Sequence, residues 1–308
     1  MKRFVVLGVL VVIGALTLGV AAQQQSNAPK VLEVTKLKDN LYVLKGGGGN
    51  TAVFIMGDGV TVIDAKFPGW GQPILDKIKT LTDKPVVRLI NTHTHADHVG
   101  GNVEFPATID IVTQVNTKAN MEKMVSPPGI PPQPSNIFKD NNGRGMPKRT
   151  FKDKMTIGKG ADRIDLFYFG RGHTNGDAWV VFPSLRVMHA GDMFAAKSVP
   201  LLDSNNGGSG VAMPDSLQKA YDTVKNVDVI ITGHSTEMTM ADLKEYADFN
   251  RDFLNDMRAA VKAGKSVDEE ASTWKIPAKY TGYATPMPER LKFNVQIVYD
   301  ELKAGVKK

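Results

Sequence analysis

The sequence contains no cysteine, and it has only six histidines and three tryptophans among its 308 residues. Without cysteine the chain has no disulfide, no thiolate metal site, no cysteine nucleophile and no lipoprotein anchor. Runs of like charge are absent as well: the formal net charge of +6 is scattered, whereas nucleic-acid binding needs a clustered basic stripe. No repeat of fixed period occurs. Because 42% of the residues are hydrophobic, the chain can bury a full core, as an ordinary globular protein does.

The N-terminal segment differs from the rest of the chain. Two basic residues precede an apolar run that ends at Ala22, and polar residues follow. This pattern predicts a secretory signal peptide at 1–22 and a polar linker at 23–30. An uncleaved anchor is the alternative, because the run is nearly long enough to span a bilayer, although its glycines weaken that interpretation. We expect a periplasmic or secreted protein without stable membrane insertion after signal removal, in which 31–308 form a single domain with a C-terminal helical extension.

Apolar periodicity predicts an order of strands and helices. Alternating apolar and polar residues predict two hairpins, with turns at 38–40 and 57–59. Helical spacing over 72–81 precedes a buried strand, VVRLIN. Further strands are expected at 163–169, 178–182, 186–190 and 227–232. Two stretches of strands, each followed by helices, predict an α/β fold with a sheet-on-sheet core and helices outside.

A long helix is expected after the last of these strands. Thr239 and Asp242 have the spacing of a capping box, and apolar residues recur on one face as far as Val261. Gly264 is placed to end this helix. The segment 126–138 has too many prolines for a regular element, so we expect a surface loop there.

Three of the six histidines crowd into the segment HTHADH at 93–98. A solvated loop has no reason to concentrate these residue types, so the segment predicts a binding site. His173, Asp192 and His234 also lie at or near the ends of predicted strands, in short loops where α/β sheets build their sites. The remaining histidine, His189, lies within an apolar strand and is expected to be a core residue.

Imidazole nitrogen and carboxylate oxygen are donors that zinc takes, and a tetrahedral site needs about three protein ligands and an open position. His93 and His95 are two residues apart, so their side chains point the same way in an extended loop. Asp97 continues this alternation, whereas His98 is displaced by one position and can serve a neighbouring ion. One segment can therefore supply two metal ions. The remaining candidate donors are His173, His234 and, as a bridging carboxylate, Asp192.

The motif HTHADH followed by Gly100 and Gly101, then GRGHT, HAGD and TGH before the predicted long helix, resembles the metallo-β-lactamase superfamily in order and spacing. The resemblance spans roughly residues 30–260 and implies a four-layer αβ/βα sandwich with a dinuclear site. It implies two zinc ions, although iron or manganese accepts the same donors. The implied ligands are His93, His95 and His173 for the first ion, Asp97, His98 and His234 for the second, and Asp192 between them.

The resemblance also implies a mechanism. A hydroxide shared by two zinc ions would attack an electrophile, with Asp97 as the candidate catalytic residue that orients the nucleophile and passes on a proton. A ligating histidine normally donates its other N–H to an acceptor. Asp64 and Asp177 are the expected acceptors, with a turn or cap role as the alternative for each.

The substrate contacts follow less directly from the sequence. The β-lactamases with a cysteine ligand carry it where this chain has Asp192, and they place a lysine three residues later, where this chain has Ala195. The loops 45–50, 66–71 and 126–148 are expected to supply the pocket walls, including Phe67 and Ile130. The candidate substrate contacts are Lys197, Asn205, Asn206 and Trp70.

We therefore expect an exported zinc-dependent hydrolase that acts on a lactone, ester or β-lactam bond of a small molecule. The aspartate at 192 resembles glyoxalase II, lactonases and many broad hydrolases, whereas export and the stretch GRGHTNGD resemble the lactamase lineage. One alternative is a mononuclear iron sulfur dioxygenase on the same fold, which shares the first three histidines. Another is a non-catalytic metal-binding protein of the cell envelope. A nuclease of this superfamily would need a nucleic-acid domain or a basic stripe, and neither is evident.

Overall fold

The computed structural model describes residues 30–306. The expected signal peptide at 1–22 and residues 23–29 of the linker lie outside the described residues. From Leu32 onward the chain forms one unit. None of the helices in this described part has the length and apolarity needed to cross a membrane.

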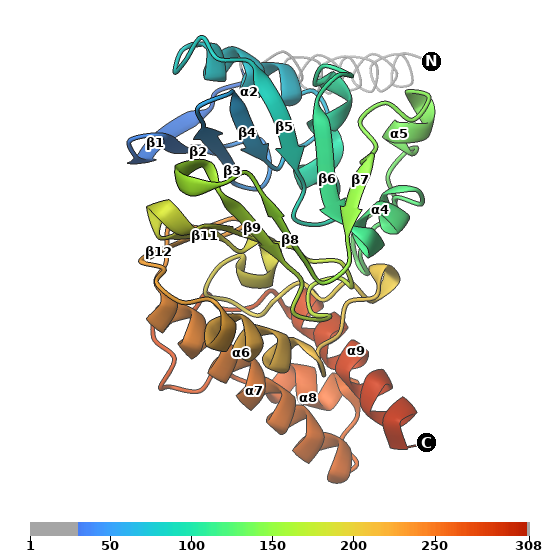
Figure 1. The fold of residues 1–308 in the computed structure, drawn as a ribbon. Coiled ribbons are helices and arrows are strands. Elements are labelled where there is room, and N and C mark those ends of the chain that lie inside the picture. Colours follow the sequence, from blue (N-terminus) through green and yellow to red (C-terminus); the bar gives the residue numbers. More distant parts are fainter. Residues whose placement is uncertain (1–29, 307–308) are drawn as a thin grey trace, which may run out of the picture. The chain divides into compact units, whose positions relative to one another are not determined.

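Seven strands form the first sheet, in the order β1-β2-β3-β4-β5-β6-β7 (Figure 1). They are β1 (Glu33–Lys38), β2 (Leu41–Lys45), β3 (Thr51–Ile55), β4 (Val60–Ile63), β5 (Val86–Ile90), β6 (Asp110–Gln114) and β7 (Arg149–Phe151). Neighbours from β1 to β4 pair antiparallel, and neighbours from β4 to β7 pair parallel. The parallel half therefore directs the carboxyl ends of β4, β5 and β6 to the same edge.

Five strands form the second sheet, in the order β12-β11-β10-β9-β8. They are β8 (Lys154–Ile157), β9 (Ile164–Phe167), β10 (Trp179–Phe182), β11 (Val187–His189) and β12 (Val229–Ile231). Only β11 and β12 pair parallel in this sheet.

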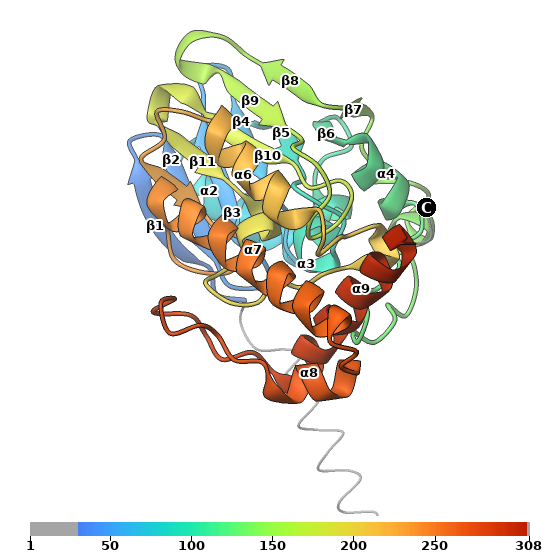
Figure 2. The same cartoon turned by 90° about the horizontal axis from the view of Figure 1, so that it is seen from below.

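The helices follow or separate the strands. They are α2 (Gly71–Lys79), α3 (Ala96–Val99), α4 (Val115–Met121), α5 (Ile137–Asp140), α6 (Met213–Thr223), α7 (Met240–Lys262), α8 (Val267–Thr273) and α9 (Pro288–Val306). Helices α6 and α7 lie side by side over the second sheet, on the side away from the first (Figures 1 and 2).

Alternating side chains divide the hydrophobic core into layers. In β10, Val180 and Phe182 belong to the core between the two sheets, whereas Trp179 and Val181 belong to the core shared with α6, α7 and α9. Phe54 of the first sheet joins the central core, with its ring 5.1 Å from that of Phe182. The outer face of the first sheet packs against α2. The order helix, sheet, sheet, helix confirms the four-layer αβ/βα sandwich.

The predicted elements are present with shifted ends. The turn at 57–59 closes through a hydrogen bond from Met56 N to Gly59 O of 2.8 Å. Thr239 and Asp242 form the expected capping box of α7, and Gly264 follows its C-terminus with a φ of 72°. Strands β6, β7 and β8 and helices α3, α4 and α6 were not expected from the sequence pattern, and α5 begins inside the expected proline-rich loop.

Candidate metal centre

The residues singled out by their chemistry meet at one edge of the two sheets. The HTHADH motif begins directly after β5 and continues into α3. The loops after β9, β11 and β12 carry His173, Asp192 and His234. Each loop follows a strand, so the sheets hold the side chains in place while the loops let them converge. They form two groups that could each hold a metal ion.

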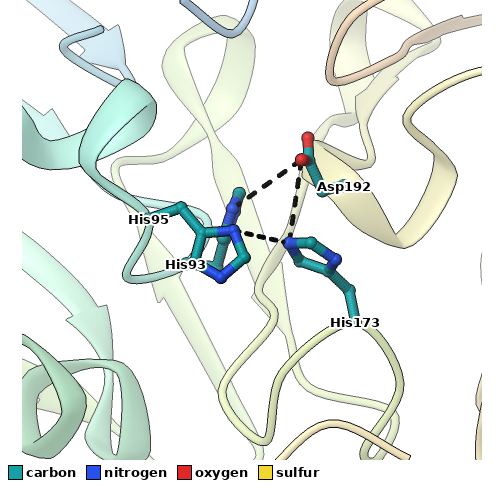
Figure 3. A group of neighbouring side chains, drawn as sticks. All are labelled: His93, His95, His173 and Asp192. Carbon is teal, nitrogen blue, oxygen red and sulfur yellow. Dashed lines mark hydrogen bonds and ion pairs between the residues drawn. The ribbon is translucent and has the colours of Figure 1, made fainter. Parts of the chain in front are cut away.

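The first group consists of His93, His95, His173 and Asp192, and their nearest donor atoms lie within 4.8 Å of one another (Figure 3). His95 Nδ1 lies 2.9 Å from His173 Nε2. Asp192 Oδ2 lies 3.9 Å from His93 Nε2 and 3.7 Å from His173 Nε2. Three imidazoles and one carboxylate therefore point at one small volume.

The second group consists of Asp97, His98 and His234. His98 Nε2 and His234 Nε2 are 3.3 Å apart, and His234 Nε2 lies 3.2 Å from Asp97 Oδ2. Asp192 reaches this group too: its Oδ1 lies 3.3 Å from His98 Nε2 and its Oδ2 lies 3.2 Å from His234 Nε2. One carboxylate thus stands between the two groups.

The ring nitrogens that face away from the two groups contact acceptors. His95 Nε2 donates to Asp203 Oδ2 at 2.7 Å, and His98 Nδ1 donates to Asp64 Oδ2 at 2.7 Å. His173 Nδ1 donates to a backbone carbonyl oxygen at 2.6 Å. When one ring nitrogen carries the proton, the other presents a lone pair, so these contacts orient the rings as metal ligands.

Two buried atoms of the first group test whether the site fits a cation. Neither His93 Nε2 nor Asp192 Oδ1 makes a hydrogen bond to the described residues, although Asp192 Oδ1 has an ion-pair contact of 3.3 Å with His98 Nε2. Buried polar atoms nearly always have a partner, so His93 Nε2 in particular requires one that the described side chains do not provide. Imidazole and carboxylate donors at this spacing suit a divalent metal ion. The donor set therefore fits a divalent metal.

The pKa shifts leave His173 neutral and Asp97 ionised, as metal ligands must be, whereas His234 carries a proton that a bound metal ion would displace. Burial, together with the neighbouring His95, lowers the pKa of His173 to about 4. Burial would raise the pKa of Asp97, but the charge of His98 and a hydrogen bond from His234 outweigh it and hold that pKa at about 2. Burial opposes charge on His234, yet Asp192 outweighs it and raises the pKa of His234 to about 9. The carboxylates are thus ionised and favour a positive charge between them.

The glycine-rich stretch GGGGN lies against the second group. A Cβ on Gly49 would lie 2.2 Å from the Cε1 atom of His98. A Cβ on Gly48, whose φ is 121°, would lie 2.6 Å from the carbonyl oxygen of Asp97. The absence of side chains at Gly48 and Gly49 therefore allows this stretch to approach the second group closely.

A cavity of about 310 Å³ opens beside the two groups. Its polar lining includes His95, Asp97, Asp192 and His234, whereas most of its apolar lining comes from other loops. The apolar lining includes Phe67, Met124, Val125, Pro127, Ile130 and Leu201. The size suits a small molecule.

The structure brings none of the four candidate substrate contacts to the lining of this cavity. Lys197 forms ion pairs of 2.7 and 3.0 Å with two acidic side chains, from the N-terminal part of α7. Asn205 and Asn206 donate their side-chain amides to backbone carbonyls of the loop after α4. Trp70 packs against the apolar cluster under α2. Each of the four is therefore engaged in holding the fold.

Asp64 and Asp177 were expected to accept hydrogen bonds from ligating histidines, and only one of them does. Asp64 contacts His98, but Asp177 accepts hydrogen bonds from Thr174 N and Oγ1 at 2.7 and 2.8 Å and thus closes its own loop. Asp203, not singled out by the sequence, contacts His95 instead. The sequence around it, Asp-Ser-Asn-Asn, is typical of a helix cap, and its side chain does cap a short 3-10 turn. This pattern gave no sign that the same side chain also contacts His95.

His189 is fully buried within β11, as expected of a core residue.

Lys66 is a second residue that the sequence did not single out. It is fully buried, and its Nζ donates to Leu44 O at 2.9 Å and to Gly49 O at 2.7 Å. Burial lowers its pKa to about 7, although Asp64 and Asp97 act in the opposite direction. This cation ties the glycine-rich stretch to the loop after β4. A lysine directly after an apolar strand was its only signal.

Comparisons with known proteins agree with this geometry. The family model of the metallo-beta-lactamase superfamily matches residues 44–234. A metallo-beta-lactamase type 2 from Elizabethkingia meningoseptica is 27% identical over 221 residues, covering 66% of this chain and 78% of that protein. A hydroxyacylglutathione hydrolase from Crocosphaera subtropica is 27% identical over 171 residues, covering 55% of this chain and 54% of that protein. The structure of a metallo-beta-lactamase from Pontibacter korlensis matches with a TM-score of 0.58 at 20% identity, covering 72% of this chain and 99% of that one.

Proposed function

The chain belongs to the metallo-β-lactamase superfamily, and from this premise we propose that it is a zinc-dependent hydrolase of a lactone, ester or β-lactam bond. The relatives named above are metal-dependent hydrolases, which supports the reaction class. Hydrolysis of an ester or lactam bond needs a positioned nucleophile and a group that stabilises developing negative charge. The two groups of donors beside the cavity support the presence of both.

The observation that carries the proposal is the convergence of seven donor side chains into two groups that share Asp192. A mononuclear centre, such as that of an iron sulfur dioxygenase, needs only the first group. The second group would then have no reason to collect two imidazoles and a carboxylate around one point. A non-catalytic metal-binding protein has no need of a cavity beside the ions. Both alternatives therefore explain less of the site.

The proposed ligands follow the two groups. His93, His95 and His173 would hold the first ion, Asp97, His98 and His234 the second, and Asp192 would reach both. Bound divalent ions supply Lewis acidity, which lowers the pKa of water and polarises a carbonyl oxygen. Zinc accepts this donor set, and iron or manganese does so as well.

The protein's own groups prepare the reaction. Asp97 is ionised at neutral pH and lies on the wall of the cavity, so it accepts a hydrogen bond from the attacking water and orients it. Its pKa of about 2 makes it a better positioning group than proton acceptor. Asp203 and Asp64 hold the rings of His95 and His98 in the tautomer that presents a lone pair inward.

We also propose export to the periplasm or the medium, based on the sequence of 1–22. Intact-mass measurement of the protein recovered from the periplasm tests this, since cleavage after Ala22 predicts a chain that begins at Gln23. A full-length chain in the membrane fraction would contradict it.

Hydrolysis tests the reaction class directly. The assay follows a chromogenic cephalosporin and a simple γ-lactone, with protein as purified, after chelation and after zinc is restored. We expect turnover that is lost on chelation and recovered with zinc. Asp97→Asn should lower kcat by about 100-fold or more, because a positioned catalytic group contributes about 10² to 10⁴. Asp165→Asn, at a buried carboxylate of β9 outside the site, is the matched control.

The outcomes separate the three functions. Turnover of either substrate that depends on metal and on Asp97 supports the hydrolase and ranks the bond types. Iron as the bound metal, with oxygen consumption and no hydrolysis, would replace it with the dioxygenase. Firm metal binding without any turnover would leave a binding protein.

A further inference from the structure

The cavity beside the two groups has an apolar wall that is exposed to solvent. Phe67, Val125 and Ile130 all line it, and their exposed fractions are 45%, 46% and 39%. Only seven large hydrophobic residues are exposed in the described part of the chain, and three of them gather here. Exposed apolar residues that cluster in a concave site mark a surface that binds an apolar group.

The same lining contains no lysine or arginine. Its charged side chains, apart from imidazoles, are the carboxylates Asp97 and Asp192. Lys197 is withdrawn into ion pairs with Asp242 and Glu245. Arg290 contacts the wall loop through the backbone carbonyl of a proline, yet it is not part of the lining. A carboxylate on a substrate would therefore find no lysine or arginine in the wall to pair with.

The wall is held in shape from outside the cavity. The side-chain amides of Asn205 and Asn206 donate to the backbone of residues 125–126 at 2.8 and 2.7 Å. A Cβ on Gly129 would lie 2.2 Å from the ring of Phe293, which comes from α9. The loop is thus fastened on two sides, so an apolar group binds a largely preformed surface and pays little ordering entropy.

The inference from these observations rests on the proposed function and defines its substrate more narrowly. We infer that the substrate is an uncharged ester or lactone whose apolar acyl or alkyl group lies against Phe67, Val125 and Ile130. Substrates recognised through a carboxylate, as most β-lactam drugs would require, are expected to be poor. The apolar group supplies affinity, and the polar side of the cavity receives the scissile bond.

A homologous series of γ-lactones tests this with one methylene added at a time. Each buried methylene should raise kcat/KM about fourfold until the cavity is filled, since burial of one methylene stabilises by about 0.8 kcal/mol. A lactone of equal length that ends in a carboxylate should be turned over at least tenfold less efficiently. Equal or better turnover of the charged analogue would overturn the inference.

Two variants locate the effect. Val125→Ser and Ile130→Ser should flatten the dependence of kcat/KM on the chain length of the lactone. Val115→Ser is the matched control, because Val115 has a similar exposed fraction of 42% but does not line the cavity. A chain-length dependence that survives in Val125→Ser and Ile130→Ser would place the apolar group elsewhere and overturn the assignment.

A binding measurement separates this inference from the proposed function. N-alkyl pyrrolidinones are uncharged lactams without ring strain that resist hydrolysis, and their affinity is measured by calorimetry. Affinity that rises with alkyl length in the wild type and in Val115→Ser, but not in Val125→Ser, supports the apolar site even if no lactone is turned over. Affinity that is independent of length in the wild type overturns the inference even if hydrolysis occurs.

Discussion

Replacing Asp203 with asparagine tests whether the contact to His95 serves the metal centre. Asp203 is fully buried, and its Oδ2 accepts from His95 Nε2 at 2.7 Å and from Asn206 Nδ2 at 2.6 Å. Its Oδ1 accepts from Asn206 N at 3.1 Å. Asparagine has nearly the same volume but only one oxygen. If that oxygen keeps His95, the new NH₂ faces the N–H of Asn206 and two donors meet.

The expected loss follows from the role of such acceptors. Removing the carboxylate that orients a ligating histidine costs about 10- to 100-fold in metal affinity, or about 1.4 to 2.7 kcal/mol. Asp203→Asn should therefore lower the affinity for the first of the two zinc ions by this factor. Asp64→Asn should lower the affinity for the second ion by a similar factor, because Asp64 holds His98 in the second group.

Zinc titration against a competing chromophoric chelator measures both affinities. Thermal unfolding followed by circular dichroism establishes that each variant is folded. Asp165→Asn removes a buried carboxylate of β9 that touches no ligand and should leave both affinities unchanged. If Asp203→Asn binds both ions within twofold of the wild type, the contact to His95 has no part in metal binding and the reasoning is refuted.

Three further changes test other contacts. Gly49→Ala should lower the affinity for the second ion at least tenfold in the same titration, because the new methyl group would lie 2.2 Å from the ring of His98. Unchanged affinity would mean that the ring moves freely. Phe293→Ala should raise KM about fivefold, because a loosened loop costs on the order of 1 kcal/mol to order; a change in kcat or metal content in steady-state assays would contradict this. Lys66 has its pKa lowered by burial from 10.5 to about 7, so in metal-depleted protein the unfolded state binds more protons between these values. The free energy of unfolding of the wild type should therefore rise with pH in that window, by about 1.4 kcal/mol per pH unit more than that of Lys66→Met, as measured by urea unfolding. Lys262→Met, at an exposed position, is the control. Equal slopes for the wild type and Lys66→Met would refute the prediction.

The convergence of the donor side chains was predictable because their signal is concentrated in short motifs. HTHADH places several donors in one turn of chain, and His173, Asp192 and His234 follow strands that apolar periodicity also reveals. Sheet formation then brings the strand ends to one edge. Asp203 could not be found this way, because 108 residues separate it from His95 in the sequence.

Two of the three strands that escaped prediction have weak apolar patterns. Strands β7 and β8 each have a single buried residue, so alternation hardly appears in them, whereas β6 has four buried residues of five. The ion pairs of Lys197 could not be predicted either, because its partners, Asp242 and Glu245, belong to a helix far along the chain. Side chains that choose between a pocket and a surface partner are decided by tertiary contacts, which local sequence does not encode.

The central claim is that one carboxylate joins two metal ions, and counting metal ions tests it most directly. Native mass spectrometry would count ions on wild type, His173→Ala and His234→Ala purified without added metal. The account predicts about two ions per wild-type chain and about one in each variant, since each removes a donor from a different group. One ion in the wild type that is lost in His173→Ala and unaffected by His234→Ala would contradict the dinuclear centre.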